Sequence, residues 1–162
     1  MARLLVVYTP VIAAAVAANI GLPVQGSLIA IAAGLILWTL LEYAIHRFAF
    51  HGFLPHYQHH EDPRNEQYIV SPLWLSGGTT LALWVVMRIP AGSWARSGLT
   101  LAAIITGYLA YEGVHLRIHS NAPGGPLLRA LRKRHYYHHF ADERYCYGVT
   151  TPVWDRVFGS QP

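Results

Sequence analysis

The longest stretch without a formal charge covers residues 4–41, which is 38 residues in a row. One membrane-crossing helix needs only about 20 apolar residues, so this stretch is too long for a single span. Glycine and proline occur near its middle, at residues 21–26, and these residues favour a tight turn. The sequence therefore predicts two membrane-spanning helices, over about residues 4–21 and 26–45. A signal peptide is the alternative for the first, but no polar mature segment follows it.

Two further uncharged runs cover residues 67–87 and 97–111. Pro72 suits the first turn of a helix, so we expect a third span over about residues 71–88. The fourth run is short for a crossing, and we expect a span over about 97–116 whose helix continues to His119. These runs predict an all-α integral membrane protein with about four transmembrane helices, in one domain over residues 1–162.

Composition supports a membrane protein and excludes several other classes. Only 12% of the residues are charged and 53% are hydrophobic, whereas soluble domains carry roughly 25% charged residues. Disorder is excluded as well, because it needs low hydrophobicity and high charge. The single cysteine, Cys146, rules out an internal disulfide, a cysteine-built zinc site and an iron–sulfur cluster.

The positive residues predict the orientation of the chain in the membrane. Four spans put both termini on one side, together with ten cationic residues: Arg3, Arg47, Arg64, Arg117, Arg129, Arg132, Lys133, Arg134, Arg144 and Arg156. The other side has only Arg88 and Arg96. Because positive loops stay in the cytoplasm, we expect both termini and the segments 46–70 and 117–162 there. The net charge of +4 is thus a topology signal, and no nucleic-acid motif accompanies it.

All ten histidines fall in two windows, residues 46–60 and 115–139. They are His46, His51, His56, His59, His60, His115, His119, His135, His138 and His139. Helix positions i, i+3 and i+4 share a face, so each H-x-x-H-H group is expected to aim three imidazoles at one point. His46 and His51 are about 140° apart on an ideal helix, and they converge only if the helix bends or ends, which Gly52 permits.

This many imidazoles in ordered spacing predicts a metal centre on the cytosolic helices. Ten ligands exceed two tetrahedral sites, but they suit two ions with five or six ligands each and room for oxygen or water. We therefore expect two redox-active ions, with iron as the first choice, although a purified sample could carry zinc. Glu42 and Glu112 are expected to orient bound imidazoles. A salt bridge of each with an arginine is the open alternative.

Four histidine boxes carry a resemblance to a known family. They are E-Y-A-I-H-R-F-A-F-H at residues 42–51, H-Y-Q-H-H at 56–60, H-L-R-I-H at 115–119 and H-Y-Y-H-H at 135–139. With the closing segment Y-G-V-T-T-P-V-W-D-R-V-F-G at 147–159, they resemble the fatty acid hydroxylase/sterol desaturase superfamily of integral-membrane di-metal oxygenases. The boxes are most similar to those of the fatty acid 2-hydroxylases, and the resemblance implies that the ten histidines hold two metal ions.

Two features depart from the eukaryotic 2-hydroxylases. The gap between His51 and His56 is short, and these 162 residues hold no cytochrome b5 domain of the kind fused to some members. The compact size and the short gap are also similar to those of bacterial carotenoid hydroxylases. The resemblance therefore implies the class of reaction more strongly than the substrate.

The expected activity is O2-dependent hydroxylation of a lipid C–H bond. The chain has no dinucleotide fingerprint, so we expect a separate electron donor, such as a ferredoxin or cytochrome b5 with its reductase. The basic run at residues 129–134 could dock that donor or contact lipid headgroups. No substrate-binding residue is assigned. Four aromatic residues in or near the spans are candidates to line the lipid, but we favour their interpretation as packing residues: Trp38, Tyr43, Tyr108 and Tyr111.

Three alternatives remain open at this point. A carotenoid ring hydroxylase and a lipid or sterol desaturase share the same superfamily and the same first hydrogen abstraction. A protein of another class, which binds or transports metal without oxygen chemistry, would need an ionisable path through the bilayer. The predicted spans contain no Asp, Glu or His at mid-membrane, which counts against such a path.

Overall fold

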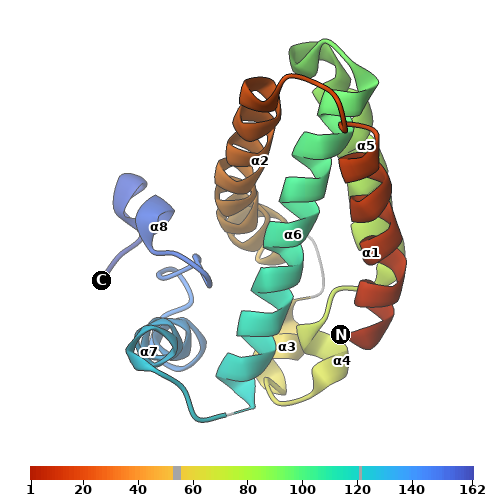
Figure 1. The fold of residues 1–162 in the computed structure, drawn as a ribbon. Coiled ribbons are helices and arrows are strands. Elements are labelled where there is room, and N and C mark those ends of the chain that lie inside the picture. Colours follow the sequence, from red (N-terminus) through yellow and green to blue (C-terminus); the bar gives the residue numbers. More distant parts are fainter. Residues whose placement is uncertain (53–55, 121) are drawn as a thin grey trace. The chain divides into compact units, whose positions relative to one another are not determined.

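The computed structural model describes residues 1–52, 56–120 and 122–162, and no residue in these ranges lies in a strand. The helices, in chain order (Figure 1), are α1 (Ala2–Ala17), α2 (Val24–Ala44), the π-helix η1 (Ile45–Phe50), α3 (Tyr57–Glu61), α4 (Glu66–Ile69), α5 (Leu73–Ala91), α6 (Trp94–His119), α7 (Pro126–Phe140) and α8 (Val153–Val157). The all-helical fold predicted from the sequence is thus confirmed over the described residues.

The helix ends follow local sequence signals. Pro72 precedes α5, and Gly92 ends that helix with a positive φ of 67°. The prediction that α6 continues to His119 is confirmed. Helix α1 ends at Ala17, earlier than predicted, because the Asn19 side-chain amide donates hydrogen bonds to the carbonyls of Ala15 and Ala95, each at 2.8 Å.

Three helical stretches are long and apolar enough to cross a membrane: Val24–Phe50, Glu66–Ala91 and Trp94–His119. Helix α1 is apolar but has 16 residues, or about 24 Å, against roughly 30 Å of bilayer hydrocarbon. Large apolar side chains such as Val6 and Ile89 are 75% and 84% exposed, as expected for surfaces that face lipid. The chain is an integral membrane protein, and the count of four spans stays a prediction.

The structure divides into two compact units. The first, which we call the span unit, comprises Met1–Trp38 and Ser71–Leu109, and the second, the histidine unit, comprises Thr39–Val70 and Ala110–Pro162. All ten histidines belong to the histidine unit. The single domain over residues 1–162 stays a prediction. The short gap between His51 and His56 falls largely on residues 53–55, which lie outside the described residues.

Small residues allow close helix packing in the span unit. A Cβ atom on Gly34 of α2 would lie 2.4 Å from the carbonyl oxygen of Thr100 on α6, and one on Gly107 would lie 2.4 Å from the Trp38 ring. The rings of Trp38 and Tyr108 pack edge to face, with centroids 5.6 Å apart. Such small-residue contacts are typical of membrane helices. The interpretation of Trp38 and Tyr108 as packing residues agrees with these contacts.

Candidate metal centre

A π-helical turn brings the first two histidines together. The amide of His51 donates to the carbonyl of His46 at 3.3 Å, so the hydrogen bond spans five residues instead of four. This wider turn rotates His51 back toward His46, and their ring centroids lie 5.2 Å apart. The sequence suggested that the helix must bend or end between them; the structure achieves the same convergence by widening one turn.

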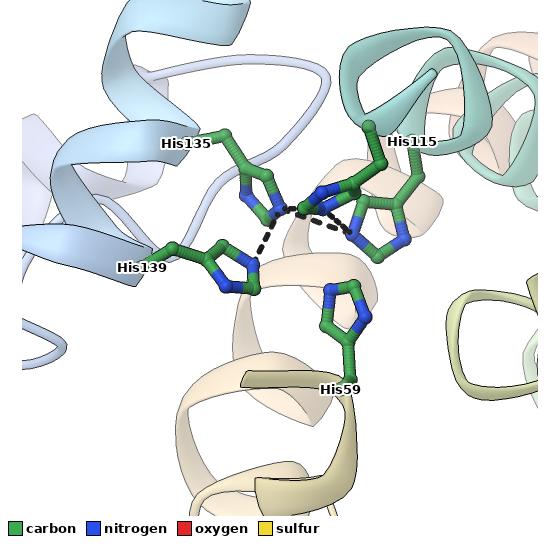
Figure 2. A group of neighbouring side chains, drawn as sticks. His59, His115, His135 and His139 are labelled. Atoms are coloured by element: carbon green, nitrogen blue, oxygen red, sulfur yellow. Dashed lines mark hydrogen bonds between the residues drawn. The ribbon is translucent and has the colours of Figure 1, made fainter. Parts of the chain in front are cut away.

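Five histidines from three helices form the first cluster, which we call the five-histidine group. It consists of His59 on α3, His115 and His119 on α6, and His135 and His139 on α7, and one ring nitrogen of each lies within 4.8 Å of those of the others. Figure 2 shows the labelled rings turned toward a common space. Residues 20 or more positions apart, such as His115 and His135, thus present their nitrogens to one point.

A second cluster, the four-histidine group, consists of His46, His51, His56 and His60, whose ring nitrogens also lie within 4.8 Å of one another. His138 adjoins this group, because its Nε2 atom is 3.0 Å from Nε2 of His51. The Nε2 atoms of His46, His56 and His60 are buried and have no hydrogen-bond partner among the described residues. Buried nitrogens that face one another without hydrogen-bond partners are the arrangement expected of metal ligands.

The division of histidines between the two groups corrects one expectation. Each H-x-x-H-H box was expected to aim three imidazoles at one point. Instead His56 and His60 belong to one group and His59 to the other, while His135 and His139 are separated in the same way from His138. The reason is angular: positions i and i+4 lie about 40° apart on a helix, but i+3 and i+4 lie about 100° apart. Each H-x-x-H-H box therefore contributes imidazoles to both clusters.

The nitrogen spacing in the five-histidine group tests whether an ion fits. His135 Nε2 lies 3.0 Å from His115 Nε2, 2.8 Å from His119 Nε2 and 3.0 Å from His139 Nε2. One ring nitrogen has either one proton or one lone pair, so hydrogen bonds cannot satisfy all three contacts. Nitrogens bound at about 2.1 Å to one ion lie about 3.0 Å apart at right angles and about 3.4 Å apart in a tetrahedron. The spacings therefore fit an ion with five or six ligands.

The histidines outside the membrane helices are held in the neutral form. Burial, with a smaller contribution from neighbouring imidazoles, lowers the pKa of His56 to about 2 and the pKa of His60 to about 4. Burial also lowers the pKa of His138 to about 3, although its contact with a backbone carbonyl opposes that shift. A neutral imidazole keeps a lone pair on one nitrogen, which is what a metal ligand requires.

Backbone carbonyls from the C-terminal segment orient two of these rings. The Nδ1 atom of His46 lies 2.6 Å from the carbonyl oxygen of Tyr147, and Nδ1 of His138 lies 2.8 Å from that of Tyr145. A ring that donates from Nδ1 to a carbonyl leaves the lone pair of Nε2 free for a metal. Sequence reasoning missed these two contacts because any residue supplies a carbonyl.

Asp155 holds this carbonyl-bearing segment in place. Its fully buried carboxylate accepts hydrogen bonds from the backbone amides of Tyr147 and Gly148, at 2.9 and 3.0 Å. It also accepts from the Ser160 hydroxyl at 2.8 Å and pairs with Arg134 of α7 at 3.0 Å. The closing segment thus acts through Asp155 as a brace behind His46 and His138.

The structure assigns Glu42 different contacts from those expected. Its carboxylate accepts hydrogen bonds from the amides of Val149 and Thr150, both at 2.7 Å, and from the Thr150 hydroxyl. The described hydrogen bonds of Glu42 therefore go to the closing segment and not to an imidazole or an arginine. Glu112 is fully buried on α6, three residues before His115, and its role as an orienting residue stays a prediction.

The three arginines of the basic run at residues 129–134 are engaged within the chain. Arg132 donates to the carbonyls of Arg117, Ile118 and Ala122, so it caps the end of α6. Arg129 donates to the Gly124 carbonyl at 2.9 Å, and Arg134 pairs with Asp155. These arginines therefore stabilise the histidine unit, and their availability to a partner or to headgroups is smaller than the sequence suggested.

Aromatic side chains and a small cavity surround the clusters. Tyr43 shares a hydrogen bond with Ser160 at 3.0 Å, which agrees with a packing role, whereas the ring of Tyr111 lies 5.4 Å from that of His115. A cavity of about 290 Å³ adjoins the five-histidine group, and its lining consists of Pro63, Arg64, His119, Tyr136 and Phe140.

Curated relatives with hydroxylase names match most of the chain. Dihydroceramide fatty acyl 2-hydroxylase FAH2 of Arabidopsis thaliana is 34% identical over 143 residues, covering 82% of this chain and 60% of that protein. Human fatty acid 2-hydroxylase is 31% identical over 139 residues, covering 77% of this chain and 37% of the human protein. Ceramide very long chain fatty acid hydroxylase SCS7 of Saccharomyces cerevisiae is 33% identical over 143 residues, covering 78% of this chain and 36% of the yeast protein.

A solved structure and a family model give the same assignment. The structure described as full-length scs7p, with only the hydroxylase domain visible, superposes with a TM-score of 0.88 at 25% identity and covers 98% of this chain and 65% of that one. The chain thus spans between about one third and two thirds of the proteins that it matches. The model of the fatty acid hydroxylase family matches residues 31–160. The chain therefore belongs to the fatty acid hydroxylase family.

Proposed function

We propose that this protein is a membrane monooxygenase that hydroxylates a C–H bond in the acyl chain of a lipid. The balanced reaction consumes the lipid, O2, two electrons and two protons, and it yields the hydroxylated lipid and water. The observation that carries the proposal is the pair of neighbouring histidine groups in a membrane protein, with ring nitrogens that converge on two points. Family membership agrees with this reaction class.

The two groups supply the ligands for two ions, which we propose to be iron. The five-histidine group would hold one ion, and the four-histidine group with His138 would hold the other. Bound iron would supply O2 activation and hydrogen abstraction. Imidazole also binds zinc, and zinc could occupy a purified sample. The near-right-angle spacing of nitrogens around His135 favours an ion that accepts more than four ligands.

The side chains around the ligands would prepare the site for this chemistry. The carbonyls of Tyr145 and Tyr147 fix the tautomers of His138 and His46, so that Nε2 faces inward. Asp155 keeps those carbonyls in place, and we propose that Glu112 supports His115 from the preceding turn of α6. Burial of the rings excludes water, which favours retention of neutral ligands.

We propose that both termini and the histidine unit lie in the cytoplasm. Ten cationic residues are predicted on that side and two on the other, which is the usual bias of membrane proteins. Electrons would come from a separate cytoplasmic donor, such as a ferredoxin or cytochrome b5 with its reductase. The internal hydrogen bonds of Arg129 and Arg132 argue that the donor docks elsewhere than on the basic run.

The names of the relatives suggest the substrate and the position of attack. They act on fatty acids, dihydroceramide and ceramide, and several are named 2-hydroxylases. We therefore propose carbon 2 of a fatty acyl chain, either free or in a ceramide-like lipid. The cavity beside His119 is a candidate route by which O2 reaches the five-histidine group.

The proposal is tested by lipid analysis of membranes with and without the protein. Membranes are supplied with an electron donor and isotopically labelled palmitate or dihydroceramide, and products are identified by mass spectrometry. We expect a gain of one oxygen at carbon 2 in the wild type, and none in His138→Ala at equal protein level. Tyr137→Phe, a change at the neighbouring and partly exposed position on α7, is the matched control and should keep activity.

The same assay separates the alternatives. Loss of two hydrogens from the substrate would identify a desaturase, and a hydroxylated carotenoid would identify a ring hydroxylase. A purified protein that holds metal but consumes no O2 with any of these substrates would support a metal-binding or transport protein. Full activity of His138→Ala would show that His138 is not a required ligand.

A further inference from the structure

A groove in the span unit has no role in the proposed reaction. Its volume is about 370 Å³, which lies within the range of roughly 300–1,000 Å³ of small-molecule sites. The groove is formed by α2, α5 and the start of α6, and its lining includes Gly26, Ala30, Ala33, Met87, Pro90 and Thr100. The histidines all belong to the other unit, so the groove and the candidate metal centre share no residue.

The only charged side chain among the residues that line this groove is Arg96. Its guanidinium lies against Gly26, because a Cβ atom at that glycine would be 1.6 Å from Nη1 of Arg96. Gly26 is in the first turn of α2, where backbone N–H groups give the helix end a positive character. The cation therefore lies against a surface of the same sign, an arrangement that an anion would relieve.

The span unit offers no counter-charge for Arg96. Its residues, Met1–Trp38 and Ser71–Leu109, include three arginines and no Asp or Glu. No ion pair of Arg96 occurs among the residues that the structure describes. A second cation, Arg88, also lies at this end of α5, over the ring of Trp94 at 5.4 Å. The groove thus combines an apolar lining with unneutralised positive charge.

The aromatic residues nearby indicate the depth of this region in the membrane. The rings of Trp84 and Trp94 pack edge to face, with centroids 5.3 Å apart. Trp94 is the first residue of α6, after the short turn that follows α5. Tryptophan and arginine at the ends of membrane helices mark the level of lipid headgroups. At that depth the anions available to Arg96 are lipid phosphates, and the groove extends along helices that face acyl chains.

We infer that this groove binds one anionic phospholipid, with its phosphate on Arg96 and one acyl chain along the small residues of α2. A phospholipid is favoured over a free fatty acid because the groove is only partly enclosed, so a second acyl chain can remain in the bilayer. A guanidinium can donate two parallel hydrogen bonds to a phosphate, which gives the contact its strength and orientation. The bound lipid would join α2 to α5 and α6.

Native mass spectrometry of the full chain in detergent tests this inference. After delipidation, the protein is titrated with phosphatidylglycerol, with phosphatidylcholine and with oleate. We expect one equivalent of phosphatidylglycerol to bind roughly tenfold more tightly than phosphatidylcholine, because both lipids present a phosphate but the choline ammonium brings a second positive charge toward Arg96 and Arg88. Arg96→Gln should remove this preference, and Gly26→Ala should weaken it because the new methyl group displaces the guanidinium.

Two control variants separate a site from general surface charge. Arg3→Gln removes the same charge elsewhere in the span unit, and Gly77→Ala makes the same change on α5 at a position with nothing within 4 Å. Both should bind like the wild type, and helical content by circular dichroism checks that each variant is folded. Equal binding of phosphatidylglycerol and phosphatidylcholine, equal loss in Arg3→Gln, or a preference for oleate would overturn the inference. None of these readouts depends on metal or turnover.

Discussion

Replacing Asp155 by alanine should remove one metal ion more readily than the other. The substitution removes the acceptor that holds the amides of Tyr147 and Gly148, so the closing segment loses one of its two carboxylate anchors, the other being Glu42. The carbonyls of that segment contact His46 and His138, which belong to or adjoin the four-histidine group. No such contact reaches the five-histidine group among the described hydrogen bonds. We therefore expect selective loss of the ion at the four-histidine group.

The magnitude follows from the burial of this carboxylate. Asp155 is fully buried and pairs with Arg134, whose side chain is 20% exposed. Removing one partner of a buried charge pair costs about 3–5 kcal/mol. Each kcal/mol of lost unfolding free energy lowers the unfolding midpoint of a chain of this size by roughly 2–4 °C. The midpoint of Asp155→Ala should therefore be roughly 6–20 °C lower than that of the wild type. Asp155→Asn keeps the volume and one acceptor oxygen, and it should lose less.

Metal content and thermal unfolding of the purified protein measure both effects. We expect about two ions per chain in the wild type and about one in Asp155→Ala, by inductively coupled plasma mass spectrometry. Arg156→Ala, a change to the next residue on α8, is the control because Arg156 is exposed, and it should keep both ions. If Asp155→Ala retained both ions and the wild-type midpoint, the closing segment would not be the brace that we describe.

Three further results are expected. Burial raises the pKa of the Cys146 thiol, so iodoacetamide at neutral pH should alkylate the folded protein much more slowly than the unfolded one; equal rates would contradict this. Gly34→Ala should destabilise the protein by about 1–3 kcal/mol, since its methyl group would meet the Thr100 carbonyl, whereas Gly77→Ala should be neutral or slightly stabilising in thermal unfolding. Removal of metal by a chelator should lower the unfolding midpoint and added Fe(II) should restore it, because the ions bind the folded state; an unchanged midpoint in metal-free protein would argue against the two groups as ligands.

The sequence predicted the positions of most helices well, and the histidines that it proposed as ligands lie in two neighbouring groups. Long uncharged runs indicate membrane helices, and the helical spacing of the histidine boxes indicates that their side chains are close neighbours. The division of the two H-x-x-H-H boxes between the groups was missed, because sequence spacing indicates which side chains are neighbours on a helix but not which cluster each one faces. Only the packing of α3 against α6 and α7 decides that His59 joins His115 and His139.

Two other features could not be read from the sequence. The π-helical turn at residues 45–50 follows no residue preference that distinguishes it from an α-helix, and only the convergence of His46 and His51 required some distortion. The contacts of Glu42 were misassigned because an acidic residue four positions before a histidine suggests a local partner. Its partners are Val149 and Thr150, more than 100 residues later in the chain.

The brace formed by the closing segment also has a consequence for the order of biosynthesis. Ribosomes release a chain from its N-terminus at about 5–20 residues per second, so residues 145–160 emerge after all ten histidines. Until then, His46 and His138 lack the carbonyls of Tyr147 and Tyr145. The nascent protein can therefore insert its apolar helices before the carbonyls orient either ring. Metal binding at the four-histidine group then becomes a late step in maturation.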